Sequence, residues 1–84
     1  MKRLVFTTHA QARLQERRLD PKWVEDTARK PEWTEPEPGD DTLERRFKAI
    51  PQGDGRILRV VCAETDTTIR VISAMFDRDA RRKP

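Results

Sequence analysis

Two apolar stretches separated by a short polar segment constrain the fold of this chain most. Residues 57–63 and 69–76 are rich in β-branched and large apolar side chains, and Glu64-Thr65-Asp66-Thr67 lies between them. Short apolar runs bounded by turn-forming residues are typical of β-strands. The pattern therefore predicts strands over residues 56–63 and 68–76, joined by a tight turn.

A third strand precedes this hairpin. Residues 43–50 alternate, with two sets of side chains on opposite sides of the strand: Arg45, Phe47 and Ala49 on one, Glu44, Arg46 and Lys48 on the other. Residues 51–55 contain one proline and two glycines, as hairpin turns often do. Residues 31–41 are rich in proline and acidic side chains, and they predict an extended loop that has room for a short strand near Trp33.

The N-terminal part predicts two helices. Residues 4–6 are a short apolar piece, either an edge strand or a lead-in, and a helix begins at Thr7 or Thr8. With Thr8 as N-cap, Gln11 would complete a capping box. Asp20 and Pro21 have the residue types of an N-cap and a first helical position, so a second helix starts there.

The second helix has clear signals at both ends. Leu19 before the cap and Val24 after it fit a hydrophobic staple. Pro31 ends the helix, because the residue before a proline is pushed out of the helical region. The chain is thus expected to be one α+β domain over residues 1–84, with two N-terminal helices packed on a three- to four-stranded antiparallel sheet. Its charged tail, residues 77–84, is expected to fray or to form a short turn.

The number and type of charged residues indicate what kind of ligand the protein binds. Charged residues make up 39% of the chain but the net charge is only +3, which suits a folded domain rather than a disordered one. Thirteen of the 18 basic residues are arginine, whose planar fork of donors suits phosphate and carboxylate. A GC-rich coding background explains the same bias equally well.

Several classes are excluded or disfavoured. Cys62 is the only cysteine, so an internal disulfide is impossible, and its apolar neighbours indicate a small core residue. No segment approaches the ~20 apolar residues of a membrane span, and no signal-peptide core is present, so a cytoplasmic protein without membrane contact is expected. One histidine and one cysteine cannot build a zinc site, and no nucleotide-binding or Ser-His-Asp motif occurs. We therefore expect neither a metal nor a cofactor.

The first predicted helix carries the main candidate site. His9, Arg13 and Arg17 recur every four residues and form one stripe. His9 is the only side chain that readily changes its charge near neutral pH, and the helix dipole and the two arginines favour its neutral form. A neutral imidazole beside two arginines could be a general base next to a phosphate clamp. Spacing alone is equally compatible with a solvated helix face.

The predicted sheet adds a second set of candidates. Arg46, Lys48, Arg59 and Arg70 lie in strands and would form a basic floor for a phosphodiester backbone if they shared one face. Ser73 could donate to a phosphate oxygen or occupy a core position. The alternative is that these arginines are scattered and paired with local carboxylates such as Glu44 or Glu64.

The segment FTTHAQARLQER at residues 6–17, followed by LDP at residues 19–21, resembles the opening of the DUF4258 family. The resemblance implies a fold akin to RelE-, ParE- and BrnT-type toxins, which cleave RNA without a metal. It implies that His9 is the base or acid, that Arg13 and Arg17 hold the phosphate, and that Arg70 and Ser73 are secondary contacts. RNA and a cognate antitoxin are the implied partners.

A rival hypothesis requires no catalysis. The mixed charges, the small core and the two tryptophans also fit a protein-interaction module or a small homodimeric accessory protein. A basic stripe and an acidic loop on one chain could be self-complementary.

Overall fold

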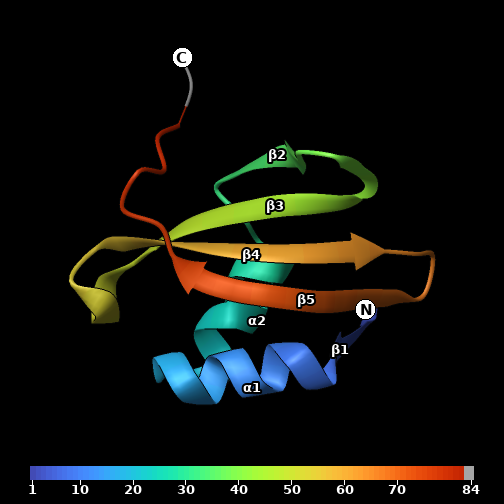
Figure 1. Ribbon diagram of the computed structural model, residues 1–84, viewed down its shortest axis with the longest axis horizontal. Coiled ribbons are helices and arrows are strands. Elements are labelled where there is room, and N and C mark those ends of the chain that lie inside the picture. Colours follow the sequence, from blue (N-terminus) through green and yellow to red (C-terminus); the bar gives the residue numbers. More distant parts are fainter. Residues whose placement is uncertain (83–84) are drawn as a thin grey trace.

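The computed structural model describes residues 1–82 and shows two helices on one face of a curved sheet (Figure 1). Its elements, with a short 3-10 turn at Pro51–Gly53, are β1 (Arg3–Phe6), α1 (Thr8–Arg17), α2 (Pro21–Arg29), β2 (Trp33–Glu37), β3 (Asp40–Ile50), β4 (Arg56–Glu64) and β5 (Thr68–Phe76). The predicted α+β class with two N-terminal helices is confirmed. No helix of the described part of the chain is long and apolar enough to cross a membrane.

The sheet has five strands in the order β1-β5-β4-β3-β2, so the predicted count of three to four strands is wrong. It is also mixed, because β1 pairs parallel with β5, with Leu4 opposite Ile69. The other pairs are antiparallel. The short apolar piece at residues 4–6 belongs to β1, which covers the edge of β5, the last strand. Helices α1 and α2 connect β1, at one edge of the sheet, to β2 at the other edge. The acidic loop supplies β2, which turns into β3 at Gly39 with a φ of 82°.

The start of α1 differs from the predicted capping box. Thr7, not Thr8, is the N-cap, and its Oγ1 accepts from the backbone N–H of Ala10 at 3.0 Å. The backbone N–H of Thr7 also donates to the carbonyl of Val71 at 3.1 Å. This bond to β5 holds Thr7 in an extended conformation, so the helix begins directly after it.

The predicted start of α2 is confirmed. Asp20 is the N-cap, its Oδ1 accepts from the N–H of Lys22 at 2.9 Å, and Pro21 is the first helical residue. Leu19 and Val24, which flank the cap, are 5% and 0% exposed and belong to the core. The helix ends at Arg29, two residues before the proline that was expected to stop it.

The core lies between the helices and one face of the sheet. Its members come from both helices and from β3, β4 and β5, and include Ala10, Leu14, Leu19, Val24, Ala28, Ile50, Leu58, Val60, Cys62, Ile69, Val71 and Ala74. Strands β4 and β5 supply most of the sheet residues because they are central and lie over the helices (Figure 1).

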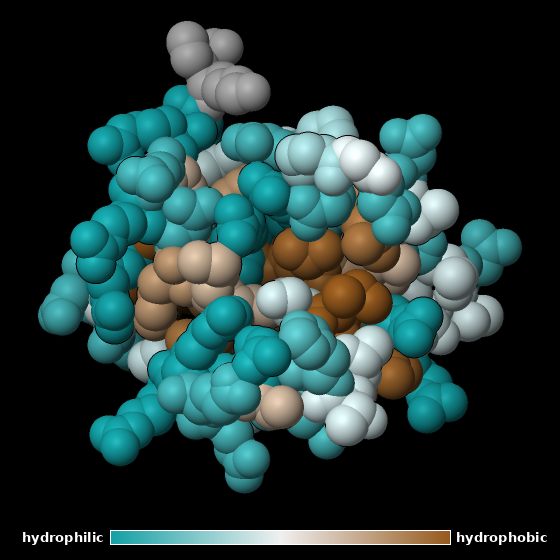
Figure 2. Space-filling model, in the orientation of Figure 1, coloured by the Kyte–Doolittle hydropathy of each residue, from teal (hydrophilic) through white to brown (hydrophobic). Residues whose placement is uncertain are grey.

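The alternation predicted for β3 is present, but its charged side is the one that faces the helices. Arg46 lies opposite fully buried Val60, and Lys48 lies opposite fully buried Leu58. Phe47 points to the other side of the sheet, which we call the open face, where its ring stacks on Trp33 at 4.8 Å. Phe47 is nevertheless only 2% exposed. In Figure 2, apolar residues gather over the middle of this face and hydrophilic ones surround them.

The charged tail was expected to fray or to form a short turn; it has a turn at residues 78–79 and contacts other parts of the chain as far as Arg82. The N–H of Asp77 donates to the carbonyl of Ile57 at 2.9 Å, and its carboxylate accepts from Arg59 at 3.0 Å. Farther along, Arg82 donates to the carbonyl of Glu32 at 2.8 Å. The part of the predicted fraying that falls on residues 83–84 lies outside the described residues.

Candidate functional site

The stripe on α1 is present as predicted, with one residue on each successive turn of the helix. His9 lies in the first turn and is exposed, and its imidazole has no hydrogen-bond partner within residues 1–82. It is therefore not a satisfied core histidine. An exposed imidazole at this place is free to meet a ligand from solvent.

The two arginines of the stripe already donate hydrogen bonds to other groups of the protein. Nη1 of Arg13 donates to the carboxylate of Glu16, one turn along the helix. Nη1 of Arg17 donates to the backbone carbonyl of Ala74 in β5 at 2.8 Å. Such pairs on an exposed surface are weak and exchange readily with other anions, so Arg13 remains available to a phosphate that displaces Glu16.

The hydrogen bond from Arg17 to Ala74 has a structural role that the sequence does not predict. The pairing of β1 with β5 ends at Val71, so the backbone of Ala74 lies beyond the neighbouring strand. A carbonyl left unpaired at a sheet edge must find another donor. Arg17 supplies it, and this contact places the His9–Arg17 flank of α1 beside the edge of β5.

The four basic residues of the sheet do not share one face. Arg46 and Lys48 are on the side of the helices, whereas Arg59 and Arg70 lie on the open face, opposite Phe47 and Ala63 respectively. Ser73 is also on the open face, opposite Val61. A single basic floor made of all four therefore does not form.

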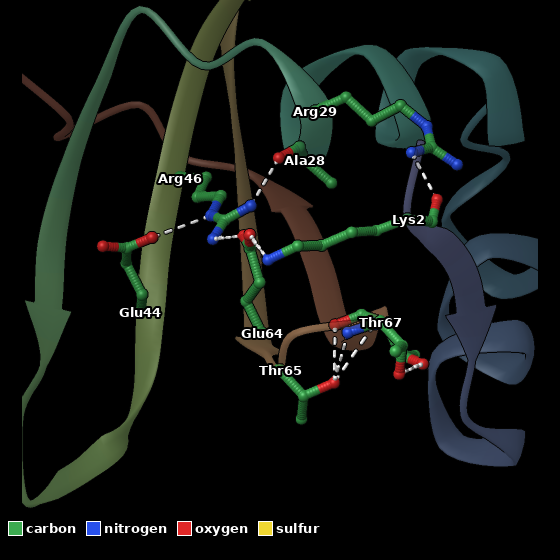
Figure 3. A network of polar contacts seen from close by, with 9 residues as sticks. Lys2, Ala28, Arg29, Glu44, Arg46, Glu64, Thr65 and Thr67 are labelled. Atoms are coloured by element: carbon green, nitrogen blue, oxygen red, sulfur yellow. Dashed lines mark hydrogen bonds and ion pairs between the residues drawn. The ribbon is translucent and has the colours of Figure 1, made fainter.

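Arg46 is held by three different partners (Figure 3). Its Nε donates to Glu44 at 2.8 Å, its Nη1 to the carbonyl of Ala28 at 2.6 Å and its Nη2 to Glu64 at 2.6 Å. Burial opposes the charge, but the hydrogen bonds to Glu64 and Glu44 outweigh it and raise the pKa of the guanidinium. These contacts are those of a structural residue that ties α2 to two strands.

The network continues to the N-terminus. Nζ of Lys2 donates to the other carboxylate oxygen of Glu64 at 2.5 Å, and Arg29 donates to the carbonyl of Lys2 at 2.8 Å. The hydrogen bonds from Lys2 and from Arg46 lower the pKa of the Glu64 carboxyl. The network therefore connects β1, α2, β3 and the end of β4.

Cys62 behaves as the sequence indicated. Its side chain is fully buried in the core, and burial raises the pKa of the thiol to about 11. A protonated, inaccessible thiol is a poor nucleophile. Cys62 is therefore a packing residue.

Arg59 is only partly satisfied by its neighbours. Its Nη1 donates to Asp77 at 3.0 Å and its Nη2 reaches only the sulfur of Met75, at 2.8 Å. The Nε of Arg59 is buried and has no partner within residues 1–82. Arg70, by contrast, is exposed and makes no ion pair in the described part of the chain. Both of these open-face arginines thus have donors that the described part of the chain does not use.

Among residues 1–82, no three His, Cys, Asp or Glu side chains come together as metal ligands would. A hollow of about 700 Å³ lies along α1, between the helix and the start of α2, but on the flank away from the stripe. Its lining includes Phe6, Gln11, Gln15 and Leu19, and none of the three stripe residues.

Comparison with known proteins gives one match. Residues 6–76 match the family described as "Domain of unknown function (DUF4258)". No curated protein and no solved structure matches the chain. Since the match spans most of the 84 residues, from the end of β1 to the end of β5, the chain belongs to the DUF4258 family.

Proposed function

We propose that this protein binds RNA along the flank of α1 that carries His9, Arg13 and Arg17, and that it cleaves RNA there without a metal. The observation that carries the proposal is the imidazole of His9, which is exposed in the first turn of a helix and has no partner among residues 1–82. The arginines of the next two turns extend the same flank to the edge of β5. Residues 6–17 resemble the opening of the DUF4258 family, and the RelE-, ParE- and BrnT-like fold that this resemblance implies supports RNA as the target.

The residues would divide the chemistry as follows. His9 takes the proton from a ribose 2′-hydroxyl, whose oxygen then attacks the adjacent phosphorus. The guanidinium of Arg13 releases the carboxylate of Glu16 and binds a phosphate oxygen instead. It then stabilises the negative charge that develops on the phosphate in the transition state. The 5′-oxygen leaves and takes up a proton from solvent or from the protonated imidazole. Arg17 keeps the flank in place through Ala74 and has further N–H donors for the backbone of the RNA.

Contacts on the open face would extend the binding surface. Arg70 is exposed and unpaired in the described residues, and it lies on β5, the strand that α1 contacts. Ser73 lies on the same strand and face. A protein with this function works in the cytoplasm, and a cognate antitoxin that covers the basic flank is the partner to look for.

The test is cleavage of a labelled RNA in the presence of EDTA by the wild-type protein and by His9→Ala. We expect the wild type to cut and the variant to lose at least about 100-fold in rate, the usual contribution of a general base. Gln15→Ala is the matched control, because Gln15 is exposed on the opposite flank of the same helix and should leave the rate unchanged. Equal rates for wild type and His9→Ala, or intact RNA with both, would refute catalysis by His9.

Binding is tested separately with a fluorescent RNA at several salt concentrations. Each phosphate contact adds to the salt dependence of binding, so Arg13→Gln and Arg70→Gln should each lower the affinity and flatten the salt dependence. If both variants bind as the wild type does, the RNA does not bind at Arg13 and Arg70, and the proposed binding surface is refuted.

A non-catalytic role in self-association has its own supporting observation. Apolar side chains lie on the open face, among them buried Val61 and half-buried Met75. Figure 2 shows apolar residues over the middle of this face with hydrophilic ones around them. Exposed Arg70 lies toward one border and the carboxylate of Glu35 toward the other, so a second copy could meet this face with complementary charges. Sedimentation over a range of concentrations and salt tests this: dimers that weaken with salt support it, and monomers at all concentrations refute it.

A further inference from the structure

A pocket of about 410 Å³ lies on the open face of the sheet, beneath the C-terminal tail. Strands β2, β3 and β4 and the tail supply its lining: Glu35, Arg45, Phe47 and Arg59 from the sheet, and Asp77, Asp79, Ala80 and Arg81 from the tail. None of the α1 stripe residues contributes to it. The pocket is thus a different site from the proposed cleavage site.

The floor of the pocket includes part of a row of side chains that crosses the sheet. Trp33, Phe47, Arg59 and Met75 lie opposite one another in β2, β3, β4 and β5. The rings of Trp33 and Phe47 are nearly parallel, with an angle of 7° between them. The guanidinium of Arg82 lies 5.5 Å from the centre of the Trp33 ring, where cation–π attraction holds the tail against the floor.

An unsatisfied donor indicates what is missing from this pocket. A buried N–H without an acceptor is rare, because it loses its bond to water without a replacement. The Nε of Arg59 is such a group. The Nη2 of the same side chain has only the thioether of Met75, a weak acceptor on a flexible side chain. Nε and Nη2 form one edge of a guanidinium, and a ligand with two adjacent acceptors would satisfy both if it displaced the flexible Met75 side chain from this edge.

The charges of the lining argue against a bare phosphate. Arg45, Arg59 and Arg81 are matched by three carboxylates, those of Glu35, Asp77 and Asp79. Arg59 already pairs with Asp77, so a free anion would meet carboxylates as often as cations. The lining fits instead a neutral, flat ligand that offers both acceptors and donors along its edges.

We propose that this pocket binds a guanine base of single-stranded RNA. Guanine offers O6 and N7 as adjacent acceptors, the pair that arginine reads with two parallel N–H donors. It also offers N–H donors on its Watson–Crick edge, which a carboxylate such as that of Glu35 can accept. Unstacked RNA bases are commonly bound by stacking on guanidinium planes and by hydrogen bonds along their edges. The proposal rests on RNA as the target of the protein, and it adds a base preference to that function.

Binding of mononucleotides tests the pocket without any cleavage. Calorimetric titration of the full chain with GMP, AMP, CMP, UMP and ribose 5-phosphate compares four bases that carry the same phosphate. We expect GMP to bind at least about tenfold more tightly than the others, the discrimination of one bidentate contact. Equal affinities for all five ligands would show binding through the phosphate alone and overturn the proposal, as would no binding of GMP.

Variants link the preference to the pocket. Arg59→Lys keeps the charge but removes the two-pronged edge, and Glu35→Gln removes the carboxylate; each should reduce the preference for GMP to less than about threefold. Glu25→Gln is the matched control, since Glu25 also pairs with an arginine but lies on α2. Circular dichroism verifies that each variant is folded. A preference that survives in both folded pocket variants would overturn the proposal.

The outcomes separate this proposal from the cleavage site. If RNA is cut in a His9-dependent way and GMP shows no preference, the pocket proposal alone falls. If GMP is preferred and RNA stays intact, the proposed role of His9 falls and the base pocket stands.

Discussion

Arg46 and Glu64 lie 18 residues apart in the sequence, and Nη2 of Arg46 donates to Oε1 of Glu64 at 2.6 Å. The pair joins β3 to the end of β4 on the side of the sheet that faces the helices. Because Arg46 also donates to the carbonyl of Ala28, one side chain links α2 to both strands (Figure 3). The most buried charge of the described residues is thus part of the framework and not of a binding surface.

Replacing Arg46 with Met should lower the free energy of unfolding by about 2 kcal/mol, because the carbonyl of Ala28 loses its donor inside the protein. Urea denaturation measures the change. Lys48→Met is the control on the same side of the same strand and should alter stability by less than about 0.5 kcal/mol. Equal effects of the two variants would contradict a framework role for Arg46.

Stability should depend on pH through Glu64. Hydrogen bonds from Lys2 and Arg46 lower the pKa of the Glu64 carboxyl in the folded state. The ionised carboxyl therefore stabilises the protein fully above the pKa that it has in the unfolded chain, about 4.3. The effect is lost as the pH falls through the lower pKa of the folded state. The difference in stability between wild type and Glu64→Gln should therefore shrink from about pH 6 to about pH 3, as measured by thermal unfolding. A difference independent of pH would refute this linkage.

Arg17→Ala should destabilise the protein by about 1 kcal/mol, since the carbonyl of Ala74 at the edge of β5 loses its hydrogen bond. Arg13→Ala removes only an exposed pair with Glu16 and should change stability by less than about 0.5 kcal/mol. Thermal melts of both variants give the comparison. If Arg13→Ala is the more destabilising variant, the edge contact of Arg17 is not what stabilises this region.

Cys62 should resist thiol reagents in the native protein. Burial raises the pKa of its thiol to about 11, so at about pH 8 the group is both protonated and inaccessible. Ellman's reagent should react at a rate that rises with urea and reaches that of a free cysteine only when the chain unfolds. Rapid reaction without denaturant would show that β4 opens in the native state.

The sequence predicted the elements whose signals are local. The Asp20-Pro21 cap, the four-residue spacing of the stripe on α1 and the extent of β5 all follow from neighbouring residues, and the structure has them. Helix α1 starts at Thr8, one of the two predicted positions, but the predicted N-cap was wrong by one residue. A bond from Thr7 to Val71, far along the chain, makes Thr7 the cap.

The sequence predicted only part of the candidate site. The stripe spacing is as expected, and Arg46 pairs with Glu44 and Glu64, the local carboxylates that the alternative named. The exposure of His9 and the bonds from Arg17 to Ala74 and from Arg46 to Ala28 are not evident from spacing. The pocket at Arg59 escaped sequence analysis, because it needs β2, β3, β4 and the tail together. The only signal for it was an arginine amid an apolar strand.

The sequence by itself determined which segments are helix or strand and which side chains alternate, because these depend on residues within a few positions of one another. Only the tertiary structure decided that β1 runs parallel to β5, that the Arg46 side of β3 faces the helices, and that Phe47 faces away from them. Alternation defines two sides of a strand but does not say which is covered. That choice is made by packing between residues distant in the chain, and it separated the basic residues of the sheet onto two faces.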